Sequence, residues 1–381
     1  MEDGKERVGI PARVVNGARA TRRWPWFVLL AIVGLGIFYA TGRSMGLKAY
    51  DDVRVFADMP ASGDVSRMDL TDAVGIIPTL WFNEKTQWPD KMPQGCDPSA
   101  ILEAAKNPGL GIRALHGQGI TGEGVAVAIV DQPIYQDHPE FAGKIAMYKG
   151  FNCNTDRSMH GPAVTSLLVG KDCGTAPGAK VYYAAVPSGL GDAKYFADAL
   201  DWLASVNKEL PEGQKIRVVS VSAAPSGKGS PFKNGDAWDR AVADAEKEGI
   251  LVLDISQVHG VIAPCWYDSA NPENVRRCTP GFPGMPGSVG SKYICVPCSP
   301  RTSAEEYVKG DYSYQYTGRG GLSWSIPYVA GVLALGWQID PDLTADEAIS
   351  LLFESAYKPD EKTNIIDPAA FVSLARIQSN R

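Results

Sequence analysis

The stretch Gly321-Leu-Ser-Trp-Ser-Ile-Pro-Tyr-Val-Ala-Gly331 places a serine four residues before a proline, and the proline opens a run of small and apolar residues. Pro327 suits the first turn of a helix, where a missing N–H has no partner to lose. Ala330 and Gly331 would let that helix pack closely against a neighbour. The stretch therefore predicts a buried helix with Ser323 just ahead of it, placed either as an exposed nucleophile or as a cap of a core helix.

The composition limits the class of protein. With 381 residues, 45% of them hydrophobic, the chain can bury a large core as one α/β domain or as two smaller ones. A net charge of −6 gives no sign of a nucleic-acid partner. We also expect no cofactor.

An apolar segment near the N-terminus is long enough to cross a bilayer. Residues 24–41 carry no charge, and Trp24, Trp26 and Tyr39 lie near its ends, where aromatic side chains favour the membrane interface. Basic residues are frequent before this segment and rare just after it, the preceding ones being Lys5, Arg7, Arg13, Arg19, Arg22 and Arg23. The asymmetry predicts that the N-terminus is cytoplasmic and the rest of the chain extracytoplasmic. A cleaved signal peptide is the alternative.

The charge and proline patterns divide the chain into four parts. We expect a cytoplasmic tail over residues 1–23, a transmembrane helix over 24–42, a stalk or small subdomain over 43–95 and a main domain over 96–381. The apolar patch at residues 76–82 is expected to dock on that main domain, whose first helix begins at Asp97.

From residue 124 onward, apolar runs typical of buried parallel strands alternate with helical patterns. The predicted strands are residues 125–130, 180–186, 216–221 and 250–255, and the predicted helices are residues 160–169, 192–208, 238–248 and 344–355. This alternation predicts an α/β fold with a doubly wound, mostly parallel sheet and helices on both of its faces. Residues 260–320, with many prolines and four cysteines, are expected to be rich in loops.

The chain has seven cysteines, and an odd number leaves at least one thiol free or paired between molecules. Cys265, Cys278, Cys295 and Cys298 could form a four-thiolate zinc site. The first two are too far apart in sequence for the usual spacing, and we expect no metal.

Functional groups in such sheets gather at the carboxyl ends of the strands. Asp131 follows the strand predicted over residues 125–130, where its carboxylate could orient a histidine or serve only in a turn. His160 stands at a predicted helix start and could be a catalytic base or a packing residue. Asp, His and Ser in this order along the chain is one of the arrangements found for catalytic triads.

Three segments together resemble the motifs of the subtilase (subtilisin-like serine protease) family. They are Gly124-Val-Ala-Val-Ala-Ile-Val-Asp131, His160-Gly-Pro-Ala-Val164 and the opening stretch around Ser323, and the resemblance extends over residues 110–375. It implies an endopeptidase with the triad Asp131, His160 and Ser323. The family's serine lies four residues before the proline, which selects Ser323 over Ser325.

The resemblance also suggests residues for binding, with some departures. Counting from the strand at residues 250–255 puts Gln257 where the family has its oxyanion asparagine, with Ser256 or His259 as alternatives. Residues 219–225 resemble the strand against which extended substrates pair, so Ser222, Ala223 and Ala224 are expected to contact the substrate. Trp324 replaces the usual methionine after the serine.

These patterns predict a membrane-anchored serine endopeptidase that acts on a peptide or protein outside the membrane. The alternative is a catalytically weak or inactive subtilase fold that serves in binding or signalling.

Overall fold

The computed structural model describes residues 46–56, 62–153, 158–256, 259, 261–287 and 289–381. The chain divides into two units, Met1–Gly46 and Leu47–Arg381, and almost all of the first lies outside the described residues. The predicted cytoplasmic tail and transmembrane helix lie outside the described residues. Within the described ranges, one helix is long and apolar enough to cross a membrane, Leu322–Ile339, but 78% of it is buried inside the fold. This helix is therefore part of the core, which accounts for its apolar composition.

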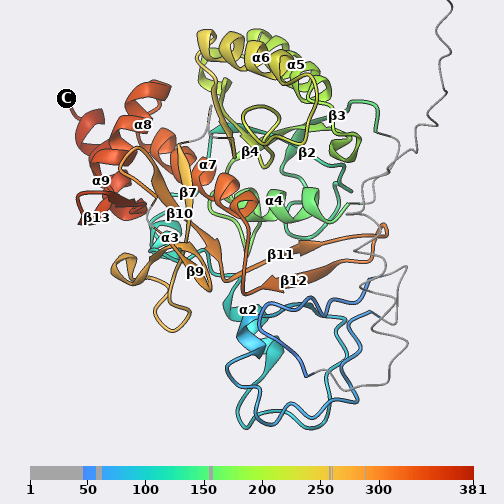
Figure 1. Ribbon diagram of the computed structural model, residues 1–381. Helices are drawn as coiled ribbons and strands as arrows, with labels where there is room; N and C mark the ends of the chain where they lie inside the picture. Colours follow the sequence, from blue (N-terminus) through green and yellow to red (C-terminus); the bar gives the residue numbers. More distant parts are fainter. Residues whose placement is uncertain (1–45, 57–61, 154–157, 257–258, 260, 288) are drawn as a thin grey trace, which may run out of the picture. The chain divides into compact units, whose positions relative to one another are not determined.

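The centre of the second unit is a sheet of five parallel strands in the order β3-β4-β2-β5-β6 (Figure 1). Their bounds are β2 Ala126–Asp131, β3 Ile145–Gly150, β4 Lys180–Ala185, β5 Ile216–Val221 and β6 Leu251–Asp254. The predicted doubly wound sheet is confirmed. The edge strand β3 was not predicted, because four of its six residues are exposed and its apolar pattern is weak.

Helices cover both faces of this sheet (Figure 1). Along β2, Val127 and Ile129 belong to the core shared with α4 (His160–Val169) and α7 (Leu322–Ile339). Ala126, Ala128 and Val130 belong to the core shared with α5 (Lys194–Glu209) and α6 (Gly235–Lys247). Because successive side chains of a strand point to opposite faces, one short apolar strand contributes to both cores.

The helix that carries Ser323 begins earlier than predicted. Helix α7 starts at Leu322 with Gly321 as its N-cap, so Pro327 lies inside the helix and not in its first turn. Proline has no N–H to donate to the carbonyl four residues earlier, which is that of Ser323. The Ser222 hydroxyl donates to this carbonyl at 2.8 Å and so replaces the missing bond.

The close approach predicted for Gly331 is confirmed. A Cβ placed on Gly331 would lie 2.6 Å from Cβ of Thr175. Real Cβ atoms do not come this close, so only glycine allows α7 to pack against the segment that follows α4.

Residues 260–320 are loop-rich, as expected, but they also form strands that were not predicted. The described part of this segment holds six strands, β7 Ile262–Trp266, β8 Thr279–Phe282, β9 Met285–Pro286, β10 Ile294–Ser299, β11 Arg301–Glu305 and β12 Ser313–Thr317. Four of them, β7, β8, β9 and β10, join β13 (Tyr357–Asp360) and β14 (Thr363–Ile365) in a sheet ordered β13-β14-β10-β7-β8-β9. Strand β10 is entirely buried despite containing Pro297 and two cysteines. Burial of the whole strand outweighs the low strand preference of proline.

The segment before residue 96 packs onto the rest of the second unit. Strand β1 (Trp81–Asn83) pairs antiparallel with β12, which makes a sheet ordered β1-β12-β11. Ile77, Leu80 and Phe82 share an apolar cluster with Tyr316 of β12. The predicted docking of residues 76–82 is confirmed, and one compact unit continues across the boundary expected at residues 95/96 because these contacts cross it.

Two of the remaining helices begin at caps that the sequence indicates. Asp97 caps α2 (Pro98–Ala104), and Thr344 and Glu347 form a capping box at α8 (Ala345–Glu354). The other helices are α3 Ile112–His116 and α9 Pro368–Ser379, with short 3₁₀ turns at Ile77–Thr79, Ser188–Leu190, Glu212–Gln214 and Val275–Arg277.

Candidate active site

Two of the predicted triad residues are in direct contact. Asp131 ends β2 and His160 begins α4, so the sheet and the helix bring together residues 29 positions apart. Oδ1 of Asp131 lies 2.7 Å from Nδ1 of His160 and also accepts a hydrogen bond from the backbone N–H of Gln132 at 2.7 Å. A carboxylate on Nδ1 fixes the tautomer that leaves Nε2 of the imidazole free to accept a proton.

The surroundings of His160 favour its charged form. Its side chain is 20% exposed, and the ring of Trp324 stacks on it with centroids 5.4 Å apart and planes inclined by 28°. Burial alone would lower the pKa of His160, but the charge and hydrogen bond of Asp131 outweigh burial and raise this pKa above its ordinary value. Protonation of the His160 ring is therefore favoured by its surroundings.

Ser323 is the second residue of α7 and is held by Ser222 at the end of β5. The Ser323 hydroxyl donates to the backbone carbonyl of Ser222 at 3.3 Å, while the Ser222 hydroxyl donates to the backbone carbonyl of Ser323 at 2.8 Å. Among the described residues, no hydrogen bond joins His160 to Ser323. Catalytic hydrogen bonds often shorten only when substrate binds.

Ser325, the other serine of this stretch, points elsewhere. It is fully buried and donates to the backbone carbonyl of Val296 at 3.0 Å. It therefore has a structural partner in β10.

Gln257, predicted as the oxyanion donor, lies outside the described residues. The two alternatives beside it are engaged with acidic side chains. The hydroxyl of Ser256 donates to Asp254 at 2.6 Å, and Nε2 of His259 lies 2.9 Å from Oδ1 of Asp239 on α6. The backbone N–H of His259 donates to the Ser256 hydroxyl at 3.1 Å, which ties the two residues together.

The predicted substrate-binding residues follow β5 directly. Ser222 contacts Ser323, as described. The carbonyl of Ala223 accepts from the N–H of Ile255 at 3.0 Å, and that of Ala224 accepts from the Ser230 hydroxyl at 2.7 Å. Their role in binding substrate stays a prediction.

The zinc alternative has no support in the structure. Across the described ranges, no group of three or more His, Cys, Asp or Glu side chains could hold a metal ion. The cysteines are free thiols, and burial raises the pKa of Cys295 and of Cys298 to about 12. These thiols are therefore protonated at neutral pH.

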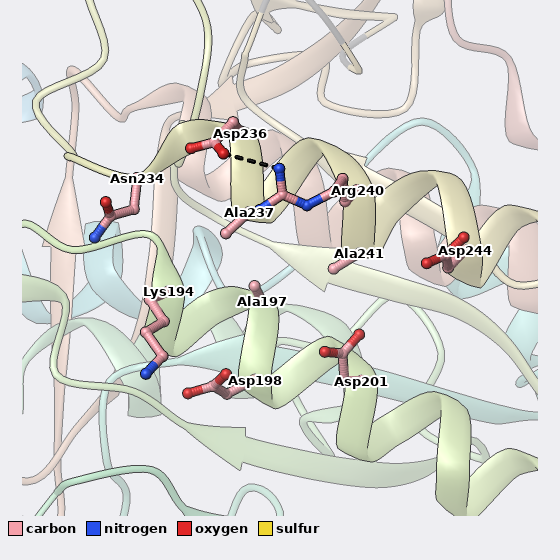
Figure 2. A pocket seen from close by; sticks show the side chains of 10 residues that line it. All are labelled: Lys194, Ala197, Asp198, Asp201, Asn234, Asp236, Ala237, Arg240, Ala241 and Asp244. Atoms are coloured by element: carbon pink, nitrogen blue, oxygen red, sulfur yellow. Dashed lines mark hydrogen bonds and ion pairs between the residues drawn. The ribbon is translucent and has the colours of Figure 1, made fainter.

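A surface hollow of about 500 Å³ between α5 and α6 contains none of the predicted site residues (Figure 2). Asp198, Asp201 and Asp244 line it together with an ion pair between Arg240 and Asp236 at 2.8 Å. Burial, and then the charges of Asp198 and Asp244, raise the pKa of Asp201. Helix-surface carboxylates of this kind do not by themselves form a site.

Two polar residues beside the Asp131–His160 pair were not predicted. Gln132 follows Asp131, and Ser158 precedes the helix that begins at His160; their side chains are hydrogen bonded to each other. A serine two residues before a helix start is a capping signal that could have indicated Ser158. Nothing in the sequence indicates Gln132.

A family model matches this site and the sheet around it. The model of the subtilase family, peptidase S8, matches residues 122–254, which include Asp131 and His160. The segment that carries Ser323 lies beyond this match.

Curated serine proteases resemble a longer part of the chain. Serine protease AprX of Bacillus subtilis (strain 168) is 26% identical over 300 residues, which is 67% of this chain and 66% of AprX. Subtilisin-like protease PopC of Myxococcus xanthus (strain DK1622) is 25% identical over 301 residues, 68% of this chain and 61% of PopC. Subtilisin Savinase of Lederbergia lenta is 26% identical over 60% of this chain and 81% of its own length. The chain thus spans less than two thirds of the length of several of these relatives.

Solved structures share the fold at low sequence identity. A chain from a structure of subtilase cytotoxin SubAB assembly superposes with a TM-score of 0.55 at 17% identity, covering 72% of this chain and 98% of that one. The A-subunit of the AB5 toxin from E. coli gives 0.53 at 16% identity, covering 71% and 98%. The chain is therefore similar to subtilases in sequence, through the matched family model and the curated relatives, and it shares their fold with the two solved structures.

Proposed function

We propose that the chain is a serine endopeptidase in which Ser323 is the nucleophile, His160 the general base and Asp131 the residue that orients His160. The observation that carries this proposal is the 2.7 Å contact between Asp131 and Nδ1 of His160 at the carboxyl end of β2. Nε2 of His160 takes the proton as Oγ of Ser323 attacks the peptide carbonyl, and later gives it to the leaving amine. The carboxylate of Asp131 stabilises the imidazolium in between.

The start of α7 supplies a donor for the oxyanion. Ser323 is the second residue of the helix, and the first backbone N–H groups of a helix have no partner within it. The N–H of Ser323 can therefore donate to the negative oxygen of the tetrahedral intermediate, assisted by the positive end of the helix dipole. We assign the second donor to the side-chain amide of Gln257.

Labelling with a fluorophosphonate probe tests the nucleophile. The full chain should be labelled, and Ser323→Ala should abolish labelling. Ser325→Ala is the matched control, since it removes the neighbouring hydroxyl on the same helix, and it should be labelled as before. Labelling that survives in Ser323→Ala, or is lost only in Ser325→Ala, would overturn the assignment.

The same probe tests the oxyanion donor. Gln257→Ala should lower the labelling rate about 10²- to 10³-fold, because one donor to the oxyanion contributes this much to the rate. An unchanged rate would remove Gln257 from the mechanism.

A second candidate function is a subtilase fold with weak or no catalysis that binds protein partners. One observation favours it. The Ser323 hydroxyl donates to the carbonyl of Ser222 at 3.3 Å, whereas a hydrogen bond to His160 would activate this hydroxyl as a nucleophile. If the folded wild-type chain shows no Ser323-dependent labelling, this candidate replaces the first.

We further propose that the chain is anchored in the membrane with its catalytic domain outside. The support is the uncharged segment at residues 24–41 and the excess of basic residues before it. The full chain should stay in the membrane fraction after alkaline carbonate extraction. Protease added to the outside of intact cells should reach the catalytic domain. Release by carbonate would contradict the anchor, and protection from the protease would contradict the orientation.

A further inference from the structure

The Asp131–His160 pair is enclosed by a second set of hydrogen bonds that the catalytic mechanism does not use. We propose that the side chains of Gln132 and Ser158, here named the Gln132–Ser158 clamp, are positioning residues that hold His160 against Asp131. The catalytic consequence of the clamp rests on the proposed function, but its structural consequence does not.

The Ser158 hydroxyl uses its full hydrogen-bonding capacity. Its oxygen accepts from the backbone N–H groups of His160 at 3.2 Å and of Gly161 at 3.1 Å, the first two residues of α4. Its proton is donated to Oε1 of Gln132 at 2.8 Å. A hydroxyl has one donor and two acceptor positions, so Ser158 is committed both to the helix start and to Gln132.

Gln132 connects this helix start to the end of β2. Its backbone N–H donates to the same Asp131 oxygen that contacts His160, at 2.7 Å. Its side-chain Nε2 donates to the hydroxyl of Ser188 at 2.9 Å, which holds the amide from its other end. A closed ring of contacts therefore runs from Asp131 through Gln132 and Ser158 to His160 and back.

Close backbone packing beside this ring of contacts leaves α4 little room to shift relative to Gln132. A Cβ on Gly161 would lie 2.4 Å from the carbonyl oxygen of Gln132 and 2.8 Å from the hydroxyl of Tyr183. That same Tyr183 hydroxyl donates to the Gln132 carbonyl at 2.5 Å. The first turn of α4 thus lies in close contact with Gln132. Because Ser158 accepts from the backbone N–H of His160, it fixes the position from which the His160 ring extends toward Asp131.

The clamp acts on the contact between His160 and Asp131. Asp131 from β2 is the charged group in contact with the ring among the described residues, and Trp324 from α7 covers its face. An opposite charge at this distance raises the pKa of a histidine. If the hydrogen bonds of Gln132 and Ser158 are lost, the contact between Asp131 and His160 loosens, and the pKa of His160 should fall toward its ordinary value.

Titration of the histidine side chains by NMR tests the clamp without requiring activity. The full chain has four histidines, so the His160 signal can be assigned by comparison with His160→Gln. We expect the lower pKa of His160 in Gln132→Met, which keeps the shape but loses both side-chain hydrogen bonds, and in Ser158→Ala. Ser158→Thr keeps the hydroxyl and should restore the wild-type value. Ser188→Ala removes only the outer tether and is the matched control.

The pH dependence of fluorophosphonate labelling gives the catalytic readout. In both loosened variants the rate should fall about tenfold and its acidic limb should move to lower pH with the His160 pKa. A variant that is merely less folded would lose labelled fraction without moving the limb. If Ser158→Ala does not fold, Gln132→Met carries the test, because Ser158 still caps α4 in it.

The outcomes separate the two proposals. An unchanged His160 pKa and an unchanged limb in folded Gln132→Met overturn the clamp. A shifted pKa in a chain whose wild type is never labelled supports the clamp and overturns the proposed function.

Discussion

The hydrogen bond from Ser222 to the Ser323 carbonyl is the most specific consequence of placing Pro327 inside a helix. Replacing Ser222 with alanine removes that donor, and Pro327 has no N–H to take its place. Ser222 is 6% exposed and Ser323 is half-buried, so water has only partial access to the Ser323 carbonyl once the hydroxyl is removed. A buried acceptor without a donor costs about 1 to 3 kcal/mol. We expect Ser222→Ala to lower the free energy of unfolding by about this amount.

The substitution Pro327→Ala restores the missing backbone N–H and so tests whether Ser222 replaces it. In Pro327→Ala, residue 327 can donate to the Ser323 carbonyl in the ordinary helical way. In this background Ser222→Ala should cost less than about 0.5 kcal/mol, near the usual error of additivity. The coupling energy between the two positions should therefore be about 0.5 to 3 kcal/mol, with the double variant more stable than the sum of the single effects predicts.

Urea denaturation of the four proteins, followed by tryptophan fluorescence, measures this coupling. Fluorophosphonate labelling of the same set reports whether the nucleophile is displaced, and we expect Ser222→Ala to be labelled more slowly than the wild type. An equal loss of stability from Ser222→Ala in both backgrounds would refute the argument that the serine replaces the N–H that proline lacks.

Three further predictions concern a charge, a buried histidine and a close helix contact. Asp131→Asn should lower the labelling rate by about 10⁴-fold and move the acidic limb of its pH profile downward, because the carboxylate raises the pKa of His160; a limb that stays in place would contradict this. Burial lowers the pKa of His138 to about 4, so between about pH 6.5 and pH 4 the histidine is protonated in the unfolded chain but not in the folded chain. The free energy of unfolding should therefore fall by about 3 kcal/mol as the pH drops through this range. Denaturation at several pH values should show a shallower fall in His138→Gln, and equal slopes would exclude His138 as the cause. Gly331→Ala should destabilise the fold by about 1 to 3 kcal/mol through overpacking against Thr175; Gly213→Ala, which meets no atom within 4 Å, is the control and should change stability by less than 1 kcal/mol.

The parts of the fold that could be predicted are those with one dominant local signal. Strand β2 and helix α4 combine an unbroken apolar run with a functional residue at the end, and the structure has Asp131 and His160 at those ends. The caps at Asp97 and Thr344 were equally visible, because a side chain bonds to the backbone two or three residues away.

The failures come from residues whose partners are distant in sequence. The position of Pro327 within α7 depends on Ser222, which lies 101 residues before the Ser323 carbonyl that it supports. Strand β10 is stabilised by burial between β14 and β7, and its Pro297 gave the opposite local signal. The Gln132–Ser158 contact depends in the same way on how the end of β2 and the start of α4 meet.

The pairing of β1 with β12 has a consequence for any proteolytic processing of the chain. The carbonyl of Leu80 accepts the N–H of Gly318, five residues before Ser323, and a Cβ on Gly318 would lie 2.3 Å from the carbonyl oxygen of Pro78. A cut after residue 83 that released this segment would turn β12 into an edge strand and remove the support beneath the loop that leads to Ser323. If the chain is cut before β1, the processed protein must still keep β1 bound to β12 in order to hold the loop before Ser323 in place.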